Sequence, residues 1–203
     1  RVGSQVAFPA SGFLEAVFAV HHALFRSDTC LLEKVHFKQI LTVQMDKPKR
    51  LFTQYDPPRK SFLISSCDKV DGFDYDHHVT GELFHMLDLP DLDPIDFESL
   101  TQSCEKRISQ SDVYDWLQER NLHYGPRFRM VQEVYLGQRQ CVIRISQASH
   151  QQSEPHTRFD PCMLDAVFHG SLFADFESTE TQSYIPVSIE KLFLHSQQPR
   201  SAW

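Results

Sequence analysis

The sequence has no paired cysteine motif, no long apolar run and no excess of basic residues, and each absence argues against a class of function. Its five cysteines stand singly and none forms a CxxC pair, which argues against a zinc site and a disulfide framework. No apolar run approaches the roughly 18 residues needed to cross a bilayer. The net charge of −7 disfavours nucleic acid and anionic membranes as partners, because both need a basic face. We therefore expect a cytoplasmic protein with reduced thiols and no metal.

A six-residue segment that occurs twice is the most informative feature that is present. The residues LEAVFA at 14–19 recur as LDAVFH at 164–169, and a proline precedes each copy by a few residues. Two apolar segments with the same local order, far apart in one chain, indicate duplication of a structural unit. The second copy carries Asp165 and His169 four positions apart, which places both side chains on one face of a helix. The first copy, with Glu15 in place of the aspartate, is interpreted mainly as scaffold.

The pattern of apolar residues predicts one long helix in each half, flanked by strands. Both helices are apolar around much of their circumference, which is typical of buried helices. A third helix follows Ser109, which can cap it. The helices are expected at 10–26, 109–121 and 161–176, and the strands at 1–8, 32–43, 51–55, 61–69, 78–83, 128–136, 140–146 and 184–194.

These elements predict an α+β protein with a double hotdog fold. A helix that is apolar on most sides must be enclosed, and a curved antiparallel sheet wrapped around it provides the enclosure. Two such units would join into one longer sheet as a pseudo-twofold repeat. A connector with two prolines and several aspartates separates the halves. We expect an N-terminal hotdog at 1–87, a linker at 88–108 and a C-terminal hotdog at 109–203.

Four segments resemble the dehydratase domains of modular type I polyketide synthases and the related domain of animal fatty-acid synthase. VAFPASGFLE at 6–15 is similar to the family's VxFPGAGYLE, and YGPRF at 124–128 matches YGPxF. DPCMLDAVFH at 160–169 matches HPxxLDxxxQ/H, with aspartate in place of the first histidine. YIPVSIEKL at 184–192 is similar to xLPVSIxxL. One match alone is weak, whereas four in the family's order together with the repeat are fairly specific.

The resemblance also predicts what lies outside the sequence. The family's catalytic base is the histidine of an HxxxGxxxxP motif, and counting back from Pro9 places it one residue before Arg1. The family's first and last strands are missing as well. We therefore expect a piece of a longer polypeptide, with the double hotdog truncated at both ends.

The resemblance implies dehydration of a 3-hydroxyacyl thioester to the trans-2-enoyl thioester during polyketide chain elongation. A base removes the α-proton, and an acid protonates the departing β-hydroxyl. The substrate would be carried on the phosphopantetheine arm of an acyl carrier protein, and the domain itself would need no cofactor. The implied partners are this carrier protein and neighbouring synthase domains, and the implied assembly is a homodimer.

The candidate catalytic residues are Asp165, His169 and Tyr124. A carboxyl group stays protonated near neutral pH when an apolar pocket disfavours its charged form, so we assign the acid to Asp165 on the buried helix. His169 would hydrogen-bond to Asp165 or to the substrate hydroxyl, and Tyr124 would donate to that hydroxyl. Backbone N–H groups at the start of the first helix would bind the thioester oxygen. The candidate substrate-binding residues are Phe8, Pro9, Gly125, Pro126 and Phe128.

Two alternative functions stay open. The same fold and acid–base pair would serve an isomerase that shifts a double bond, or a ring-forming variant that adds an internal hydroxyl to the enoyl group. If the upstream histidine is absent from the natural protein, the chain would be a non-catalytic structural or acyl-binding module. No GxSxG motif is present, which argues against a serine hydrolase.

Overall fold

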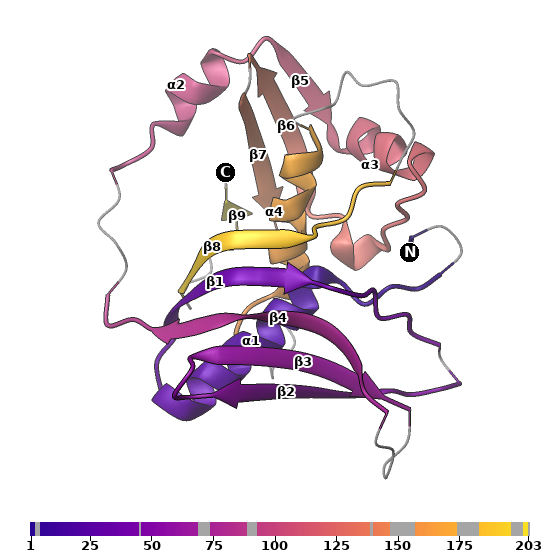
Figure 1. The fold of residues 1–203 in the computed structure, drawn as a ribbon. Helices are drawn as coiled ribbons and strands as arrows, with labels where there is room; N and C mark the ends of the chain where they lie inside the picture. Colours follow the sequence, from indigo (N-terminus) through magenta and orange to yellow (C-terminus); the bar gives the residue numbers. More distant parts are fainter. Residues whose placement is uncertain are drawn as a thin grey trace.

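The chain folds into two antiparallel sheets, each beside one long helix (Figure 1). The computed structural model describes residues 1–2, 5–44, 46–68, 74–88, 93–138, 140–146, 157–173, 183–195 and 201–202. Within these ranges, no helix is long and apolar enough to cross a membrane. The buried apolar side chains form two clusters, one beside each sheet.

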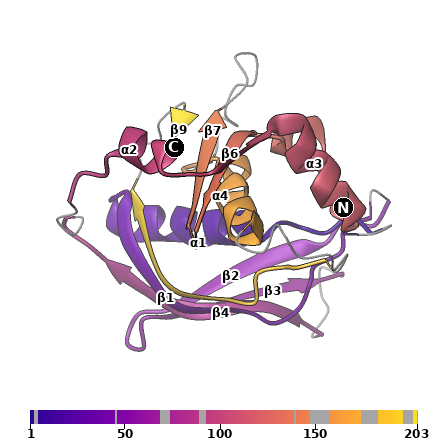
Figure 2. The same cartoon turned by 90° about the horizontal axis from the view of Figure 1, so that it is seen from above.

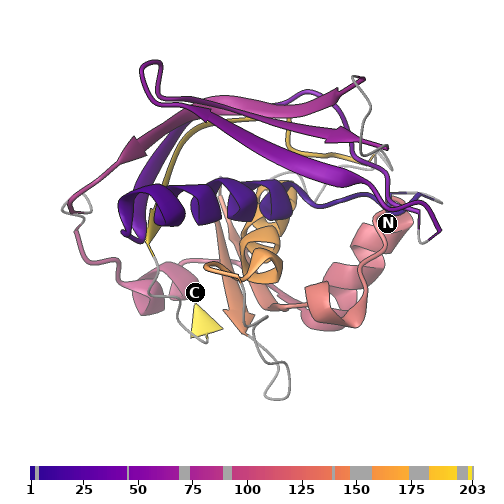
Figure 3. The same cartoon turned by 90° about the horizontal axis from the view of Figure 1, so that it is seen from below.

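The first sheet has five strands in the order β2-β3-β4-β1-β8 and curves around helix α1, Ala10–Phe25 (Figure 2). Helix α1 lies along its concave face and packs against β1, β2 and β4 (Figure 3). The strands of this sheet are β1 Thr29–Phe37, β2 Arg50–Asp56, β3 Ser61–Cys67, β4 Asp76–His85 and β8 Ser188–His195. The sheet therefore provides the enclosure that the apolar helix requires.

Helix α1 buries the apolar positions that its sequence predicts. Phe13, Leu14, Val17 and Phe18 are at most 3% exposed. Their spacing of one, three and four residues keeps them on one side of the helix, toward the sheet. The helix ends at Arg26, whose φ of 52° lies in the left-handed region that commonly ends helices.

The second sheet has four strands in the order β5-β6-β7-β9 and carries helix α4, Pro161–Phe173. Its strands are β5 Lys106–Ser109, β6 Val131–Gly137, β7 Gln140–Ser146 and β9 Ser201–Ala202. Helix α4 packs against β6 and β7, and helix α3, Gln110–Glu119, packs against β5 and β6. As predicted, Ser109 caps α3, because its hydroxyl accepts a hydrogen bond from the N–H of Asp112 at 3.3 Å.

The two halves are joined by the strands that follow the two central helices. β1 follows α1 and β8 follows α4, and these strands pair antiparallel from Thr29 opposite His195 to His36 opposite Ser188. The two central helices also contact each other. Equivalent strands of the two repeats thus meet in one sheet, and the predicted α+β double hotdog fold is confirmed. The division into 1–87, 88–108 and 109–203 stays a prediction.

The strand expected at the start of the chain is wrong. The described part of residues 1–8 forms isolated bridges, Val2 with Leu122 and Ala7 with Thr42. Alternating apolar residues favour an extended chain, but here the described pairing with 41–43 is short, with the N–H of Phe8 donating to the carbonyl of Leu41 and the N–H of Val43 to that of Val6, each at 2.8 Å. The segment instead runs between the two halves and enters α1.

The second expected strand, 32–43, is placed too far along the chain. β1 begins at Thr29 and ends at Phe37. Residues 38–43 leave the strand and lie along the segment before α1, where the N–H of Phe8 donates to the carbonyl of Leu41 at 2.8 Å. The apolar alternation continues past Phe37 because these residues form part of a cavity wall.

The expected linker contains two regular elements. Helix α2, Phe97–Gln102, and most of β5 lie inside 88–108. Ile108 is the one apolar residue of β5, so the strand has no alternating pattern. The other three residues of β5 are polar or charged, and all three side chains are exposed. The ends of the segments expected at 61–69 and 161–176 lie outside the described residues.

Candidate active site

A large cavity lies between the start of α1, one side of α4 and the turn that precedes β6. Its volume is about 1400 Å³. Phe8 and Phe13 line it beside α1, Phe128 lines it before β6, and Phe168 lines it on α4. A largely apolar wall with a few polar groups is the usual composition of a binding site for an organic ligand.

Asp165 lies on the wall of this cavity, in the second turn of α4. The start of α4 is held by Asp160, whose carboxylate accepts a hydrogen bond from the N–H of Cys162 at 2.9 Å. Asp165 is 8% exposed. Its Oδ2 lies 3.3 Å from Nε2 of His169, and its Oδ1 accepts a hydrogen bond from the hydroxyl of Ser11 at 3.4 Å. The carboxyl group is therefore buried between the two central helices, with a polar group beside each oxygen.

His169 is held by aromatic packing. It is 1% exposed, and neither ring nitrogen makes a hydrogen bond within the described part of the chain. The ring of Tyr124 packs edge-on at 4.3 Å between centroids, and that of Tyr114 packs edge-on at 6.1 Å. Nε2 lies within ion-pair distance of Asp165 but without hydrogen-bond geometry. Both nitrogens therefore keep their capacity to form a hydrogen bond with a ligand in the cavity.

Tyr124 stands beside His169 at the end of a tight turn. The carbonyl of Gly125 accepts a hydrogen bond from the N–H of Phe128 at 2.9 Å, and Arg129 Nε donates to the carbonyl of Tyr124 at 3.0 Å. Burial raises the pKa of Tyr124 above its ordinary value, and the negative charge of Asp165 adds to the rise. The hydroxyl thus keeps its proton at neutral pH and can act as a hydrogen-bond donor.

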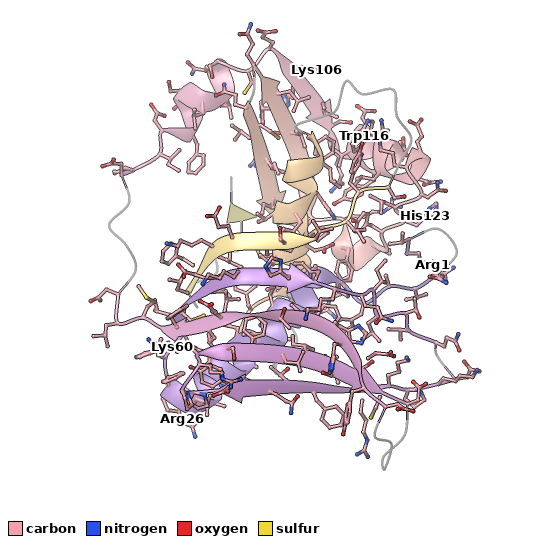
Figure 4. All side chains as sticks on the ribbon, viewed as in Figure 1. Arg1, Arg26, Lys60, Lys106, Trp116 and His123 are labelled. Carbon is pink, nitrogen blue, oxygen red and sulfur yellow. The ribbon has the colours of Figure 1, made fainter. Side chains whose placement is uncertain are left out.

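Arg1 and His123 lie next to each other, and both line the cavity (Figure 4). The N–H of His123 donates to the carbonyl of Arg1 at 2.9 Å. Arg1 therefore lies on the wall of the same cavity as Asp165.

The structure brings nearly all the predicted site residues to this cavity. The candidate catalytic residues Asp165, His169 and Tyr124 line it, as do the candidate substrate-binding residues Phe8, Pro9, Gly125 and Phe128. Pro126 is not among the lining residues, and begins the short helix η1, Pro126–Phe128. A proline suits a first helical position because its φ is already set and its missing N–H is not needed there. The catalytic and binding roles of these residues stay predictions.

Metal ligands do not gather at this site. In the ranges that the structure describes, no group of three or more His, Cys, Asp or Glu residues could hold a metal ion. The polar groups on the cavity wall include an acid, imidazoles, phenols and the start of a helix. Such groups bind and move protons.

The family model of the polyketide synthase dehydratase N-terminal domain matches residues 93–203, which is more than half of the chain. The chain belongs to the polyketide synthase dehydratase family. Among curated proteins, a sequence search finds no significant match to this chain.

Solved dehydratase structures share the fold of this chain. The dehydratase domain from the CurK module of the curacin polyketide synthase is 23% identical with a TM-score of 0.84, and the match covers 99% of this chain and 73% of that one. The CurJ dehydratase domain is 22% identical with a TM-score of 0.84, covering 98% and 70%. An N-terminal dehydratase from the difficidin assembly line is 16% identical with a TM-score of 0.80, covering 94% and 68%.

Two residues that contact the candidate catalytic groups of this chain were not predicted. Tyr114 on α3 donates its hydroxyl to the carbonyl of Phe128 at 3.2 Å and accepts from the N–H of Val131 at 3.1 Å. Ser11 on α1 donates to Asp165. Each is a single polar residue on a largely apolar helix face, and only the tertiary packing reveals its partner.

Proposed function

We propose that this dehydratase-family chain removes water from a 3-hydroxyacyl thioester on an acyl carrier protein, giving the trans-2-enoyl thioester during polyketide chain elongation. The observation that carries the proposal is the buried carboxyl of Asp165, which borders a largely apolar cavity beside His169 and Tyr124. The apolar wall suits an acyl chain, and the polar groups suit the transfer of a proton to its β-hydroxyl.

Asp165 acts as the acid in this proposal. It gives its proton to the β-hydroxyl as the carbon–oxygen bond breaks, and water leaves. Tyr124 donates a hydrogen bond to the same oxygen, and His169 bonds to Asp165 or to that hydroxyl. The electrons of the α-carbon–hydrogen bond form the new double bond once a base has taken the α-proton.

The base is expected to be a histidine joined directly before Arg1. The position of Arg1 on the wall of the cavity that Asp165 also lines supports this expectation. Among the solved CurK dehydratases, one with a histidine replaced by phenylalanine and one with an aspartate replaced by asparagine are described as inactive mutants. The proposed pair, a histidine before Arg1 and Asp165, uses the same two residue types as those descriptions.

The thioester oxygen binds at the start of α1. Pro9 and Ala10 line the cavity there, and no side chain caps the helix. The free N–H groups and the helix dipole would stabilise negative charge that develops on the oxygen. The substrate arrives on the phosphopantetheine arm of the carrier protein, and the domain itself uses no cofactor. Neighbouring synthase domains, a homodimeric assembly and a cytoplasmic location complete the proposal.

A turnover measurement tests this proposal. The full natural chain is incubated with 3-hydroxyacyl carrier-protein thioesters of several lengths and both hydroxyl configurations, and the products are weighed by mass spectrometry. We expect the loss of one water, and we expect Asp165→Asn to abolish it. Ser65→Ala is the matched control, since Ser65 is buried on β3 and its hydroxyl pairs with His77.

The outcomes separate the functions that the fold permits. Loss of water that persists in Asp165→Asn would contradict the assignment of the acid. A product of unchanged mass with a moved double bond or a new ring would identify an isomerase or a ring-forming enzyme. No change with any substrate would identify a non-catalytic module.

A further inference from the structure

Ser11 is a buried serine that reaches across from one repeat to the acid of the other. It lies in the first turn of α1 and is 0% exposed. Its hydroxyl donates to Oδ1 of Asp165 at 3.4 Å, although the two residues are 154 positions apart in the sequence. The contact therefore exists only because α1 and α4 pack against each other.

Burying the Ser11 hydroxyl costs free energy, and among the described residues only Asp165 offsets that cost. Burying a hydroxyl group without a hydrogen bond is unfavourable, and serine is a poorer helix former than alanine. For packing alone, alanine would serve better inside α1. Within the described ranges, Asp165 is the hydrogen-bond partner of the Ser11 hydroxyl, so the contact with the carboxyl group is what offsets the cost of burying that hydroxyl.

A serine hydroxyl can serve a carboxyl group in both of its protonation states. It donates to a carboxylate, and by rotating it accepts from a protonated acid. Ser11 occupies Oδ1, which leaves Oδ2 on the side of His169. The carboxyl group is thereby held with a defined oxygen beside the imidazole.

We propose that Ser11 is a positioning residue that orients the carboxyl group of Asp165 and stabilises the carboxylate formed when Asp165 gives up its proton. This inference rests on the proposed dehydration. As the carbon–oxygen bond breaks, the oxygen leaves with the bonding electrons and takes the proton of Asp165, so negative charge appears on the carboxyl group. A hydrogen bond that strengthens with this charge favours the transition state over the ground state.

Several other groups act on Asp165 and must stay in place during the test. His169 faces it from α4 itself, and Tyr124 and Tyr114 face it from the turn and from α3. Arg1 lines the same cavity from the segment before α1. The Cys162 thiol lies near it on α4. Removing the Ser11 hydroxyl alters none of these groups.

The test compares Ser11→Ala with the unaltered protein in the full natural chain. The change only removes an atom and favours the helix, so the variant is expected to fold. We expect kcat to fall about tenfold while KM changes by less than about twofold, because the hydrogen bond gains strength only as charge develops. The alkaline limb of the pH profile of kcat is expected to move to higher pH, since the charged form of the acid has lost a donor. Ser65→Ala, which also removes a buried hydroxyl, is expected to change neither quantity.

A double-mutant cycle with Asp165→Asn decides whether Ser11 acts through the acid. We expect Ser11→Ala to cause no further loss of residual activity in the Asp165→Asn protein. An equal loss in both backgrounds, or an unchanged kcat and pH profile, would overturn the inference. If the unaltered protein shows no dehydration, the proposed function fails separately, and NMR titration of the Asp165 carboxyl still tests the contact. An unchanged titration midpoint in Ser11→Ala would then reject it, and a higher midpoint would support it.

Discussion

Glu15 and Asp165 occupy equivalent positions in the two copies of the repeat, but their carboxyl groups have opposite surroundings. Glu15 accepts hydrogen bonds from the backbone N–H groups of Arg158 and Phe159, at 2.6 and 2.7 Å. Asp165 instead borders the cavity and contacts the hydroxyl of Ser11. The chain that leads into α4 thus occupies the place beside Glu15, whereas the place beside Asp165 is open to a ligand. The carboxyl group of Glu15 thus holds the two halves together, whereas that of Asp165 can contact a ligand in the cavity.

Replacing Glu15 with glutamine is expected to destabilise the protein by about 1–3 kcal/mol. The carboxylate satisfies two backbone donors, whereas the glutamine side chain has one oxygen and would leave one donor unpaired. Burial raises the pKa of Glu15, and the two backbone hydrogen bonds act in the opposite direction. Urea denaturation at pH 7 measures the change. Glu98→Gln is the control, because Glu98 lies in the short helix α2, where no residue is buried. Equal stability of Glu15→Gln and the unaltered protein would contradict a role of Glu15 in holding the two halves together.

Tyr114→Phe is expected to destabilise the turn that carries Tyr124. The Tyr114 hydroxyl bonds both to the carbonyl of Phe128 and to the N–H of Val131, so it ties the end of the turn to the start of β6. Phenylalanine keeps the ring beside His169 and removes only these bonds. We expect a loss of about 1–3 kcal/mol in the free energy of unfolding and faster hydrogen exchange at Val131. Unchanged protection of that amide from exchange would argue against a stabilising role for the two hydrogen bonds of Tyr114.

Gly170 allows α4 to approach β7 closely. We therefore predict that Gly170→Ala lowers the stability of the unaltered protein but raises the stability of a protein that carries Ile143→Val. A Cβ atom at Gly170 would collide with the side chain of Ile143, mainly with its Cδ1. We expect Gly170→Ala to cost about 1 kcal/mol in the unaltered protein, as overpacking outweighs the helix propensity of alanine. In Ile143→Val, which lacks that terminal carbon, the same change should stabilise by up to about 1 kcal/mol. Denaturation of the four proteins tests this, and an identical effect in both backgrounds would refute it.

The stability of the protein is expected to fall as the pH drops below about 6.5, through His21. Burial lowers the pKa of His21 in the folded state, and the charge of His85, whose Nδ1 lies 3.3 Å from Nε2 of His21, lowers it further. The unfolded chain then binds a proton that the folded chain excludes, so acid favours unfolding. His22 and Asp28, the other charged groups nearby, oppose each other.

Unfolding midpoints from pH 5 to 8, at intervals of about half a unit, measure this loss. His85→Gln removes one of the causes that lower the pKa of His21 and is expected to reduce the acid sensitivity, whereas replacement of the exposed His36 is expected to leave it unchanged. A midpoint that is independent of pH over this range would contradict the account.

The sequence alone predicted the elements whose apolar period is strong. The central helices, β2, β3, β6 and β7 lie close to their expected positions, because burial of one face imposes a period of 3.6 or 2 residues on the sequence. β5 was missed because a short strand with one buried side chain has no period to detect. The expected strand at 1–8 was wrong because strand formation needs a neighbour, and the neighbour is set by the fold.

For the candidate site, the sequence indicated Asp165, His169 and Tyr124, because the internal repeat and the family motifs are local patterns of residues. The tertiary structure alone decided that Ser11 meets Asp165 and that Tyr114 fixes the turn beside His169. It also decided which copy of the repeated carboxyl group is closed by the chain and which borders a cavity. A sequence records periodicity and local motifs, whereas contacts between residues more than a hundred positions apart depend on how the helices and sheets pack.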